Sequence, residues 1–414
     1  MKEEILSSLS NPAQLEGLYR KNKSAFRQNF TELYPQIQGQ PAAEFWHQRL
    51  TYTSDSVSWG TASEWRFVLI AALIAGFLAK FPAIFSIDEE FFYPRNMGFV
   101  ALSFVTAYFA WKNQLKAKPL GILAGITAIA LLYINSLPDN VESDTLTLAC
   151  MHLPLLLWAV LGYSYIHGNL NFLPERLDFL RFNGDAVIMG AVLFLSGLLL
   201  SGITIGLFSL IGIQIEKFYM EWIAVFGLAS APLVASHLTQ TNPQLVNKVP
   251  PIIAKIFSPL VLIMLLIYLG AIVYSGKDPY NDREFLLLFN MLLIGVMALI
   301  FFSVAESSAE GKIDWGTKIL AALSVVTVIV NLIALSAIVF RISEWGFTPN
   351  RTAVLGINLL MLVHLILVCK DLLRTVGGKT QLQEVGFTIA KYLPIYVVWT
   401  AIVVFLFPIL FGFE

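Results

Sequence analysis

The sequence predicts an all-α protein, a polytopic helical membrane bundle of about 11 transmembrane helices with a short amphipathic cytoplasmic N-terminal region. Three observations predict this class. Hydrophobic residues make up 57% of the 414 residues and charged residues only 13%, which is more apolar surface than one soluble core buries. From Arg66 onward, apolar stretches alternate with short polar loops. Lys and Arg also concentrate in alternate loops.

Residues 1 to 65 form a polar, amphipathic region of cytoplasmic helices, distinct from the multi-span transmembrane domain at residues 66 to 414. Asn11 followed by Pro12 is typical of a helix start. Six apolar residues then fall on one helical face: Leu15, Leu18, Tyr19, Phe26, Phe30 and Leu33. A second helix is expected from Glu44 to Leu50. This region either packs against its own bundle or the lipid headgroups, or binds a protein partner through residues 11 to 50.

Eleven apolar segments approach the length that a hydrocarbon layer of ~30 Å requires. The predicted spans are residues 66 to 85, 96 to 111, 119 to 137, 145 to 166, 184 to 211, 219 to 238, 251 to 275, 285 to 305, 317 to 340, 352 to 369 and 387 to 411. The second span is short. No internal repeat is visible, so the inverted-repeat signature of many transporters is not seen.

The positive residues predict the orientation of these spans. With a cytoplasmic N-terminus, the inner segments hold 18 Lys and Arg residues and the outer loops hold 6. Positive residues near span ends are retained on the cytoplasmic side. We therefore expect a multi-pass protein of the inner (cytoplasmic) membrane, with its N-terminus inside and, for an odd number of spans, its C-terminus outside.

The most distinctive string joins two long spans on the predicted outer side and reads RISEWGFTPNR, from Arg341 to Arg351. Gly346 and Pro349 favour a tight turn, and Glu344 lies between two arginines that it could neutralise. One interpretation is a structural clamp in which Trp345 anchors the turn at the membrane interface. The other is a site where Arg341 and Arg351 bind an anion or a lipid headgroup.

This string resembles the motif of a bacterial multi-pass membrane family, the domain of unknown function 4153 family. The resemblance covers the membrane region from about residue 66 to the end, and only this string is specific. The family pattern has a tyrosine where this sequence has Trp345. The family has no established activity, so the resemblance supports the architecture and implies no substrate, cofactor or catalytic residue.

A few polar residues lie inside the predicted spans, where they are costly and therefore candidates for function. His152 and His364 could bind a metal or relay a proton if they faced each other, but satisfied core histidines are the simpler interpretation. Asn290, Asn331 and Asn358 could join helices through hydrogen bonds or line a solute path. Lys80 either extends its ammonium group to the interface or forms a buried ion pair with Asp88, Glu89 or Glu90.

The sequence excludes several classes of function. The net charge of −1 argues against a nucleic-acid partner. Nucleotide-binding loops, metal-binding motifs and nucleophile elbows are absent from the sequence, so we expect no metal, no cofactor and no nucleotide. The favoured function is permease-like transport of a small solute or lipid. A scaffold or sensor subunit of a larger complex is the alternative, and an intramembrane enzyme acting on lipid-linked substrates is the third.

Overall fold

The computed structural model describes the backbone of residues 2 to 21, 23 to 51, 59 to 140, 142 to 211, 213 to 246, 249 to 275, 283 to 307 and 315 to 413. These residues form helices and turns, with no strand among them, which confirms the all-α class. The chain divides into two compact units, Met1–Ser58 and Trp59–Glu414. The sequence predicted a division a few residues later, after residue 65.

The described residues of the first unit form four helices: α1 (Lys2–Ser7), α2 (Pro12–Lys21), α3 (Lys23–Ile37) and α4 (Pro41–Thr51). Helix α2 begins where the sequence predicts, and Asn11 Oδ1 accepts a hydrogen bond from the Gln14 N–H at 3.3 Å. The apolar face expected on one helix is divided between α2 and α3. The two helices fold onto each other because neither buries its apolar face alone.

The apolar side chains of this unit form a core of their own: Ile5, Leu15, Phe26, Phe30, Leu33, Ile37, Ala43, Trp46 and Leu50. At the edge of this core, the Arg49 guanidinium lies 4.6 Å from the Trp46 ring centre. Among the described side chains of the unit, the large apolar ones left exposed are Leu6 and Phe45. Most of the apolar surface expected at residues 11 to 50 is therefore used internally.

The second unit contains the apolar helices. They are α5 (Ala62–Ala79), α6 (Phe81–Phe85), α7 (Glu89–Lys112), α8 (Ala117–Ser136), α9 (Asp144–Tyr165), α10 (Leu173–Leu210), α11 (Glu216–Phe218), the π-helical segment η1 (Tyr219–Ala224), α12 (Val225–Thr241), α13 (Pro243–Val246), α14 (Val249–Ser275), α15 (Arg283–Ser307), α16 (Trp315–Trp345), α17 (Pro349–Val376), α18 (Leu382–Phe405) and α19 (Phe407–Leu410). Nine helices of the described part are long and apolar enough to cross a membrane. Helix α7 and the apolar stretch Phe289–Ala305 of α15 occupy the two remaining predicted positions. The chain is therefore an integral, multi-pass membrane protein.

Helix α10 is longer than the predicted fifth span because it begins at Leu173 rather than near residue 184. Its first turns are amphipathic and bury Leu177, Phe179 and Phe182. Farther along, apolar side chains such as Leu195 and Leu199 are more than 60% exposed. An exposed helix that is apolar on all sides fits a lipid environment rather than water.

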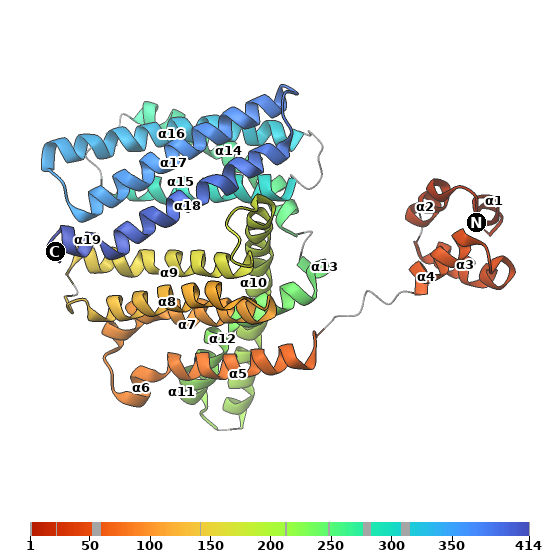
Figure 1. Ribbon diagram of the computed structural model, residues 1–414, viewed down its shortest axis with the longest axis horizontal. Helices are drawn as coiled ribbons and strands as arrows, with labels where there is room; N and C mark the ends of the chain where they lie inside the picture. The colour runs from red at the N-terminus through yellow and green to blue at the C-terminus, as the bar shows by residue number, and fades with distance from the viewer. Residues whose placement is uncertain are drawn as a thin grey trace. The chain divides into compact units, whose positions relative to one another are not determined.

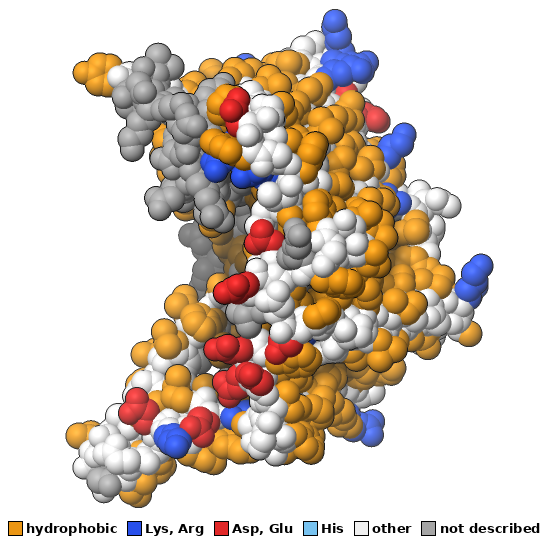
Figure 2. Space-filling view, turned by 90° about the vertical axis from the view of Figure 1, so that its left-hand side faces the viewer, with side chains coloured by type: hydrophobic (Ala, Val, Ile, Leu, Met, Phe, Trp, Pro, Cys, Tyr) orange, Lys and Arg blue, Asp and Glu red, His pale blue; other side chains and the backbone are white. Residues whose placement is uncertain are grey.

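The helices of the second unit lie mainly side by side. Figure 1 shows α7, α8, α9, α16, α17 and α18 next to one another, with α10 running across the direction of α8 and α9. We call the end where Thr61 precedes α5 the inner end, and the opposite end, with the α16–α17 turn, the outer end. Figure 2 looks onto the outer end, where Asp and Glu side chains gather between broad apolar areas. Asp88, Glu89 and Glu344 are exposed.

Helices α5 and α12 form an antiparallel pair that is packed very closely. A Cβ atom added to Gly76 would lie 2.2 Å from the Phe226 ring, so only glycine allows this approach. The chain before α12 forms the π-helical segment η1, and α12 itself contains Pro232. A π-helical segment or a proline weakens the backbone hydrogen bonds of a helix, and such irregularities are frequent at functional sites in membrane proteins.

Candidate functional site

The inner end of the α5–α12 pair carries a network of polar contacts that begins with the cap of α5. Thr61 and Glu64 form a capping box: the Glu64 N–H donates to Thr61 Oγ1 at 3.3 Å, and the Thr61 N–H donates to Glu64 Oε2 at 2.8 Å. This arrangement satisfies free N–H groups at the start of α5 and fixes the Glu64 carboxylate in place. The other carboxylate oxygen of Glu64, Oε1, is then available to a side chain of a neighbouring helix.

That neighbour is α7, which supplies Lys112 and Tyr108 from one helical face. The Lys112 ammonium lies 3.1 Å from Glu64 Oε1 and donates to the Tyr108 hydroxyl at 3.2 Å. The two α7 residues meet because they are four positions apart. Glu64 and Lys112 are partly accessible, with side chains 14% and 28% exposed, whereas Tyr108 is fully buried.

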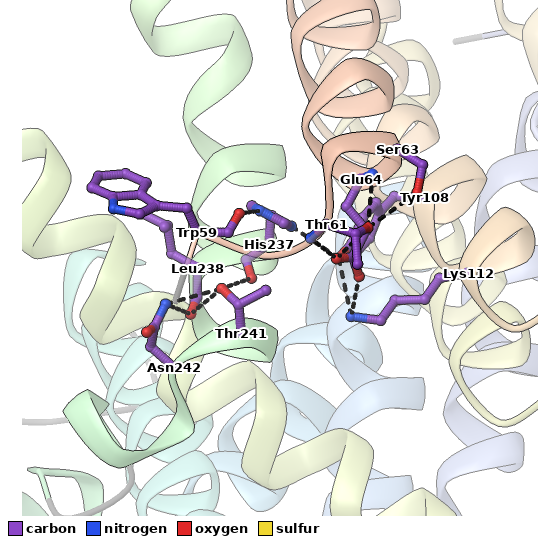
Figure 3. A network of polar contacts seen from close by, with 10 residues as sticks. All are labelled: Trp59, Thr61, Ser63, Glu64, Tyr108, Lys112, His237, Leu238, Thr241 and Asn242. Atoms are coloured by element: carbon purple, nitrogen blue, oxygen red, sulfur yellow. Dashed lines mark hydrogen bonds and ion pairs between the residues drawn. The ribbon is translucent and has the colours of Figure 1, made fainter. Parts of the chain in front are cut away.

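His237 of α12 completes the network (Figure 3). Its Nδ1 atom lies 3.1 Å from the Tyr108 hydroxyl, its Nε2 atom lies 3.1 Å from the Trp59 carbonyl oxygen, and the ring is fully buried. A carbonyl only accepts hydrogen bonds, so Nε2 carries the hydrogen. In the neutral ring Nδ1 then accepts from the Tyr108 hydroxyl, whose oxygen accepts from Lys112. Every donor along this chain has an acceptor.

The turn at Gly60 holds these groups together. Gly60 has φ +77°, and a Cβ atom there would lie 2.8 Å from both Glu64 Oε2 and His237 Cε1. The left-handed backbone and the close contacts both require glycine. The Trp65 ring lies edge-on to His237, with ring centres 5.2 Å apart. The network therefore connects α5, α7, α12 and the backbone before α5.

The hydrogen-bond directions in this network fit a neutral His237 ring. A proton on Nδ1 would turn this nitrogen into a donor, so the Tyr108 oxygen would accept from both His237 and Lys112. The Tyr108 hydrogen would then need another acceptor in a buried place, and a second cation would lie near the Lys112 ammonium. The closed network and a charged imidazole are therefore poorly compatible.

The outer end of the same helix pair is joined by a different contact. The Lys80 ammonium lies 5.0 Å from the centre of the Trp222 ring, and Lys80 is only 7% exposed. The predicted ion pair of Lys80 is not found, since among the described ion pairs none joins it to Asp88, Glu89 or Glu90. A π-face from η1 stabilises the cation instead. Extension of its ammonium group to the membrane interface stays a prediction.

The Arg341–Arg351 string forms the turn between α16 and α17. Thr348 caps α17 by accepting from the Arg351 N–H at 3.3 Å, and Gly346 has φ +77°. The Arg351 guanidinium donates to the carbonyls of Trp345 and Gly346 at 2.8 and 2.9 Å. The guanidinium carbons of Arg341 and Arg351 lie 5.2 and 5.8 Å from the Trp345 ring centre.

Glu344 does not neutralise these arginines as expected, since the ion pairs formed by described residues do not include it. Glu344 is exposed, and both guanidinium groups lie over the Trp345 ring instead. One Arg341 nitrogen, Nη1, is buried without a hydrogen-bond partner. The contacts around Arg351 have the form of the predicted structural clamp, while an anion site at Arg341 stays a prediction.

The two intramembrane histidines have different partners and do not bind each other. His152 Nδ1 lies 2.8 Å from the Leu148 carbonyl of its own helix. His364 Nδ1 lies 3.1 Å from the Tyr396 hydroxyl, and its ring stacks on Tyr392 with centres 4.3 Å apart. Within the described part of the chain, no group of three or more His, Cys, Asp or Glu side chains could hold a metal ion.

The three asparagines are also separated by their contacts. Asn358 Nδ2 donates to Asn290 Oδ1 at 2.9 Å, which is the interhelical hydrogen bond that the sequence suggested for these residues. Asn331 is fully buried, and neither of its side-chain polar atoms has a partner. The three residues therefore do not form one continuous polar lining in this structure.

Reasoning from the sequence missed His237, Tyr108, Lys112 and Glu64. Two local signals were available: Thr61-x-x-Glu64 is a capping box, and Tyr108 and Lys112 are four residues apart on one helix. His237 falls at the end of a predicted span, so its position gave no sign of complete burial. Its contact with Tyr108 joins residues 129 positions apart, and helix packing alone creates it.

Searches with the sequence and the structure found no matching family model, no similar curated protein and no similar solved structure.

Proposed function

We propose that this multi-pass protein is a permease-like carrier of a small solute or lipid, in which protonation of His237 controls the inner end of the α5–α12 pair. The observation that carries this proposal is the chain of polar contacts from the partly accessible Glu64 and Lys112 to the fully buried Tyr108 and His237. Buried ionisable residues in membrane helices are rare and commonly mark proton-linked steps. Histidine is the side chain whose ordinary protonation change falls between about pH 5 and 8.

The irregular structure of α12 supports this proposal. A π-helical segment precedes α12, and Pro232 lies inside α12. His237 of α12 contacts the Trp59 carbonyl just before α5, and Trp222 of η1 contacts Lys80 just after α5. Loss of the inner contact would leave the outer cation–π contact as a pivot. In the proposed mechanism, α12 moves about this contact between two arrangements, as alternating access requires.

The same proposal includes the predicted orientation and kinship. We place the N-terminus and the inner end on the cytoplasmic side of the inner membrane, on the basis of the 18 against 6 positive residues. We also propose kinship with the domain of unknown function 4153 family on the Arg341–Arg351 string, which adds no activity.

A pH titration with a matched variant tests the proposal. Gln at position 237 can donate to Trp59 and accept from Tyr108, yet it cannot be protonated in this range. We expect the tryptophan fluorescence of the reconstituted protein to change between about pH 5 and 8, because Trp65 lies against His237, and His237→Gln to abolish the change. The control is His152→Gln, which alters an imidazole bonded to its own helix.

Transport is measured on the same samples. Proteoliposomes are incubated with a cell extract at both ends of the pH range, and mass spectrometry identifies the solutes and lipids that they take up. We expect uptake of at least one compound to depend on pH in the wild type and in His152→Gln, but not in His237→Gln. Equal pH dependence in His237→Gln, or no protein-dependent uptake at either pH, would contradict the proposal.

A scaffold or sensor subunit is the second candidate, and the first unit favours it. That unit has an apolar core separate from the membrane helices, as expected of a module with its own binding surface. Copurification from native membranes in the presence of lipids tests this candidate. A stoichiometric protein partner that is lost when residues 1 to 51 are removed would support the subunit role over the carrier role.

A further inference from the structure

A cleft on the side of the bundle lies apart from the His237 network. It has a volume of about 430 Å³ and is lined by α8, α9, the start of α10 and α18. This volume lies within the ~300 to 1,000 Å³ typical of ligand sites. Nearly all of its lining is apolar, including Ile126, Ala159 and Val397. Such a lining in a membrane protein suits a hydrocarbon chain.

Arg176 brings a positive charge to this apolar lining. Pro394 of α18 has no N–H, so the carbonyl of Ala390, four residues earlier, lacks its usual helical donor. Arg176 Nη1 donates to that carbonyl at 3.0 Å, and Nη2 donates to the Leu170 carbonyl. A guanidinium has five N–H donors, so these two contacts fix the group and leave three donors for a ligand.

The charge of Arg176 is not balanced by a carboxylate among the described residues. Arg181, one turn farther along α10, pairs with Asp178 at 2.6 Å, and Arg95 pairs with Asp139 at 3.3 Å. No described ion pair contains Arg176, and its neighbour Glu175 lies 4.0 Å from His167 instead. A fixed guanidinium without a counterion is suited to bidentate binding of a phosphate.

The start of α8 adds positive charge beside the cleft. Lys118 is exposed and lies four residues, or one helical turn, before Ile122, which lines the cleft. The loop after α9 touches this turn, since a Cβ atom on Gly168 would lie 3.0 Å from Pro119. Lys116, also exposed, precedes α8 and provides no side-chain cap for it. An anionic group here would meet two lysines and the positive end of a helix dipole.

We propose that this cleft binds one anionic phospholipid from the leaflet at the inner end, with an acyl chain between α8, α9 and α18 and the phosphate on Arg176. The apolar lining recognises the chain, and the unbalanced guanidinium with Lys116 and Lys118 recognises the negative headgroup. Anionic lipids are enriched in the cytoplasmic leaflet, which the predicted orientation places at this end. The site shares no residue with the His237 network, so it does not depend on the carrier function.

Native mass spectrometry of the delipidated full-length protein tests the site. The protein is titrated with phosphatidylglycerol and with phosphatidylcholine carrying the same acyl chains. We expect the wild type to prefer phosphatidylglycerol, because the choline cation of phosphatidylcholine is repelled by Lys116 and Lys118. Arg176→Gln should weaken phosphatidylglycerol binding about tenfold and should also weaken phosphatidylcholine binding, because both lipids carry the phosphate that Arg176 binds. Ala159→Trp, which fills the cleft, is expected to weaken binding of both lipids. Leu132→Trp on α8 is the control, because Leu132 is 72% exposed and does not line the cleft.

Folding of the variants is checked by size-exclusion elution and melting temperature. Because Arg176 also binds two carbonyls, the double variant Lys116→Gln/Lys118→Gln provides a test that leaves these contacts intact. We expect it to reduce the preference for phosphatidylglycerol. Unchanged phosphatidylglycerol binding in Arg176→Gln, or an unchanged preference in the lysine double variant, would overturn the headgroup assignment. Unchanged binding of both lipids in Ala159→Trp would overturn the assignment of the cleft.

Discussion

The inner-end network and the outer-end turn both contain positive side chains, aromatic rings and a glycine with φ +77°. They differ in how they are built. In the outer turn, Arg351 binds carbonyls five and six residues before it, so the contacts are local and partly exposed. In the inner network, His237 binds groups 129 and 178 residues away and is buried. The more conspicuous sequence motif therefore makes contacts within its own turn, whereas the less conspicuous residues connect distant helices.

The two regions also differ in the role of charge. At the outer end, the described arginines lie on aromatic rings or are paired, while carboxylates are exposed on the surface (Figure 2). The unusual positive residues of the outer side therefore stabilise the fold locally. At the inner end, one ion pair between Glu64 and Lys112 is connected to a buried imidazole. Only this second arrangement links a charge near the surface to the packing of three helices.

The largest expected loss of stability comes from removing the central side chain of each region, His237 in the inner network and Arg351 in the outer turn. His237→Leu leaves the Tyr108 hydroxyl hydrogen without an acceptor and the Trp59 carbonyl without its His237 donor, which should lower the free energy of unfolding by about 2 to 4 kcal/mol. Arg351→Met leaves two partly exposed carbonyls that water can reach, so we expect a loss below about 1 kcal/mol. Thermal unfolding of both variants in one detergent measures the difference. Equal losses would mean that burial does not distinguish the two regions.

Gly60 and Gly346 provide a closely matched pair for the next prediction. Both have φ +77°, so alanine at either position should cost about 1 to 2 kcal/mol of backbone strain. A Cβ atom on Gly60 would also meet Glu64 and His237, whereas nothing lies within 4 Å of one on Gly346. Gly60→Ala should therefore lower the melting temperature more than Gly346→Ala. The opposite order would show that the contacts around Gly60 yield easily.

The smallest expected effect is the loss of stability of the first unit in acid. This measurement also distinguishes the pH response of that unit from the fluorescence change assigned to His237. The Gly39 N–H and the Tyr34 hydroxyl donate to Glu44 at 3.0 Å each, and these bonds lower the pKa of Glu44 below its ordinary value of 4.5. A depressed carboxyl pKa stabilises the folded state above the ordinary value, and this contribution is lost as the pH falls through the folded pKa. The protection factors of the amides in residues 2 to 51, which are corrected for the pH dependence of intrinsic exchange, should therefore fall only below about pH 4.5.

Glu44→Gln is the matched variant for that measurement, and its exchange should be less sensitive to acid. A transition of the first unit between about pH 5 and 8 would contradict the prediction and would complicate the assignment of the fluorescence change to His237. If the transition of the first unit occurs only at lower pH, it does not contribute to the fluorescence change between about pH 5 and 8.

The sequence by itself determined that the chain enters the membrane, the order of its helices and the local cap at Asn11. These properties depend on apolar length and on residues within one helical turn, which the linear sequence contains. It also indicated the Asn290–Asn358 contact as one of several options.

Only the tertiary structure decided which buried polar groups meet, because their hydrogen bonds depend on helix packing at distant positions. His237 finds Tyr108, Lys80 finds Trp222, and Arg176 finds the carbonyl freed by Pro394. A buried polar group must find a partner wherever packing provides one, and the sequence does not specify that place.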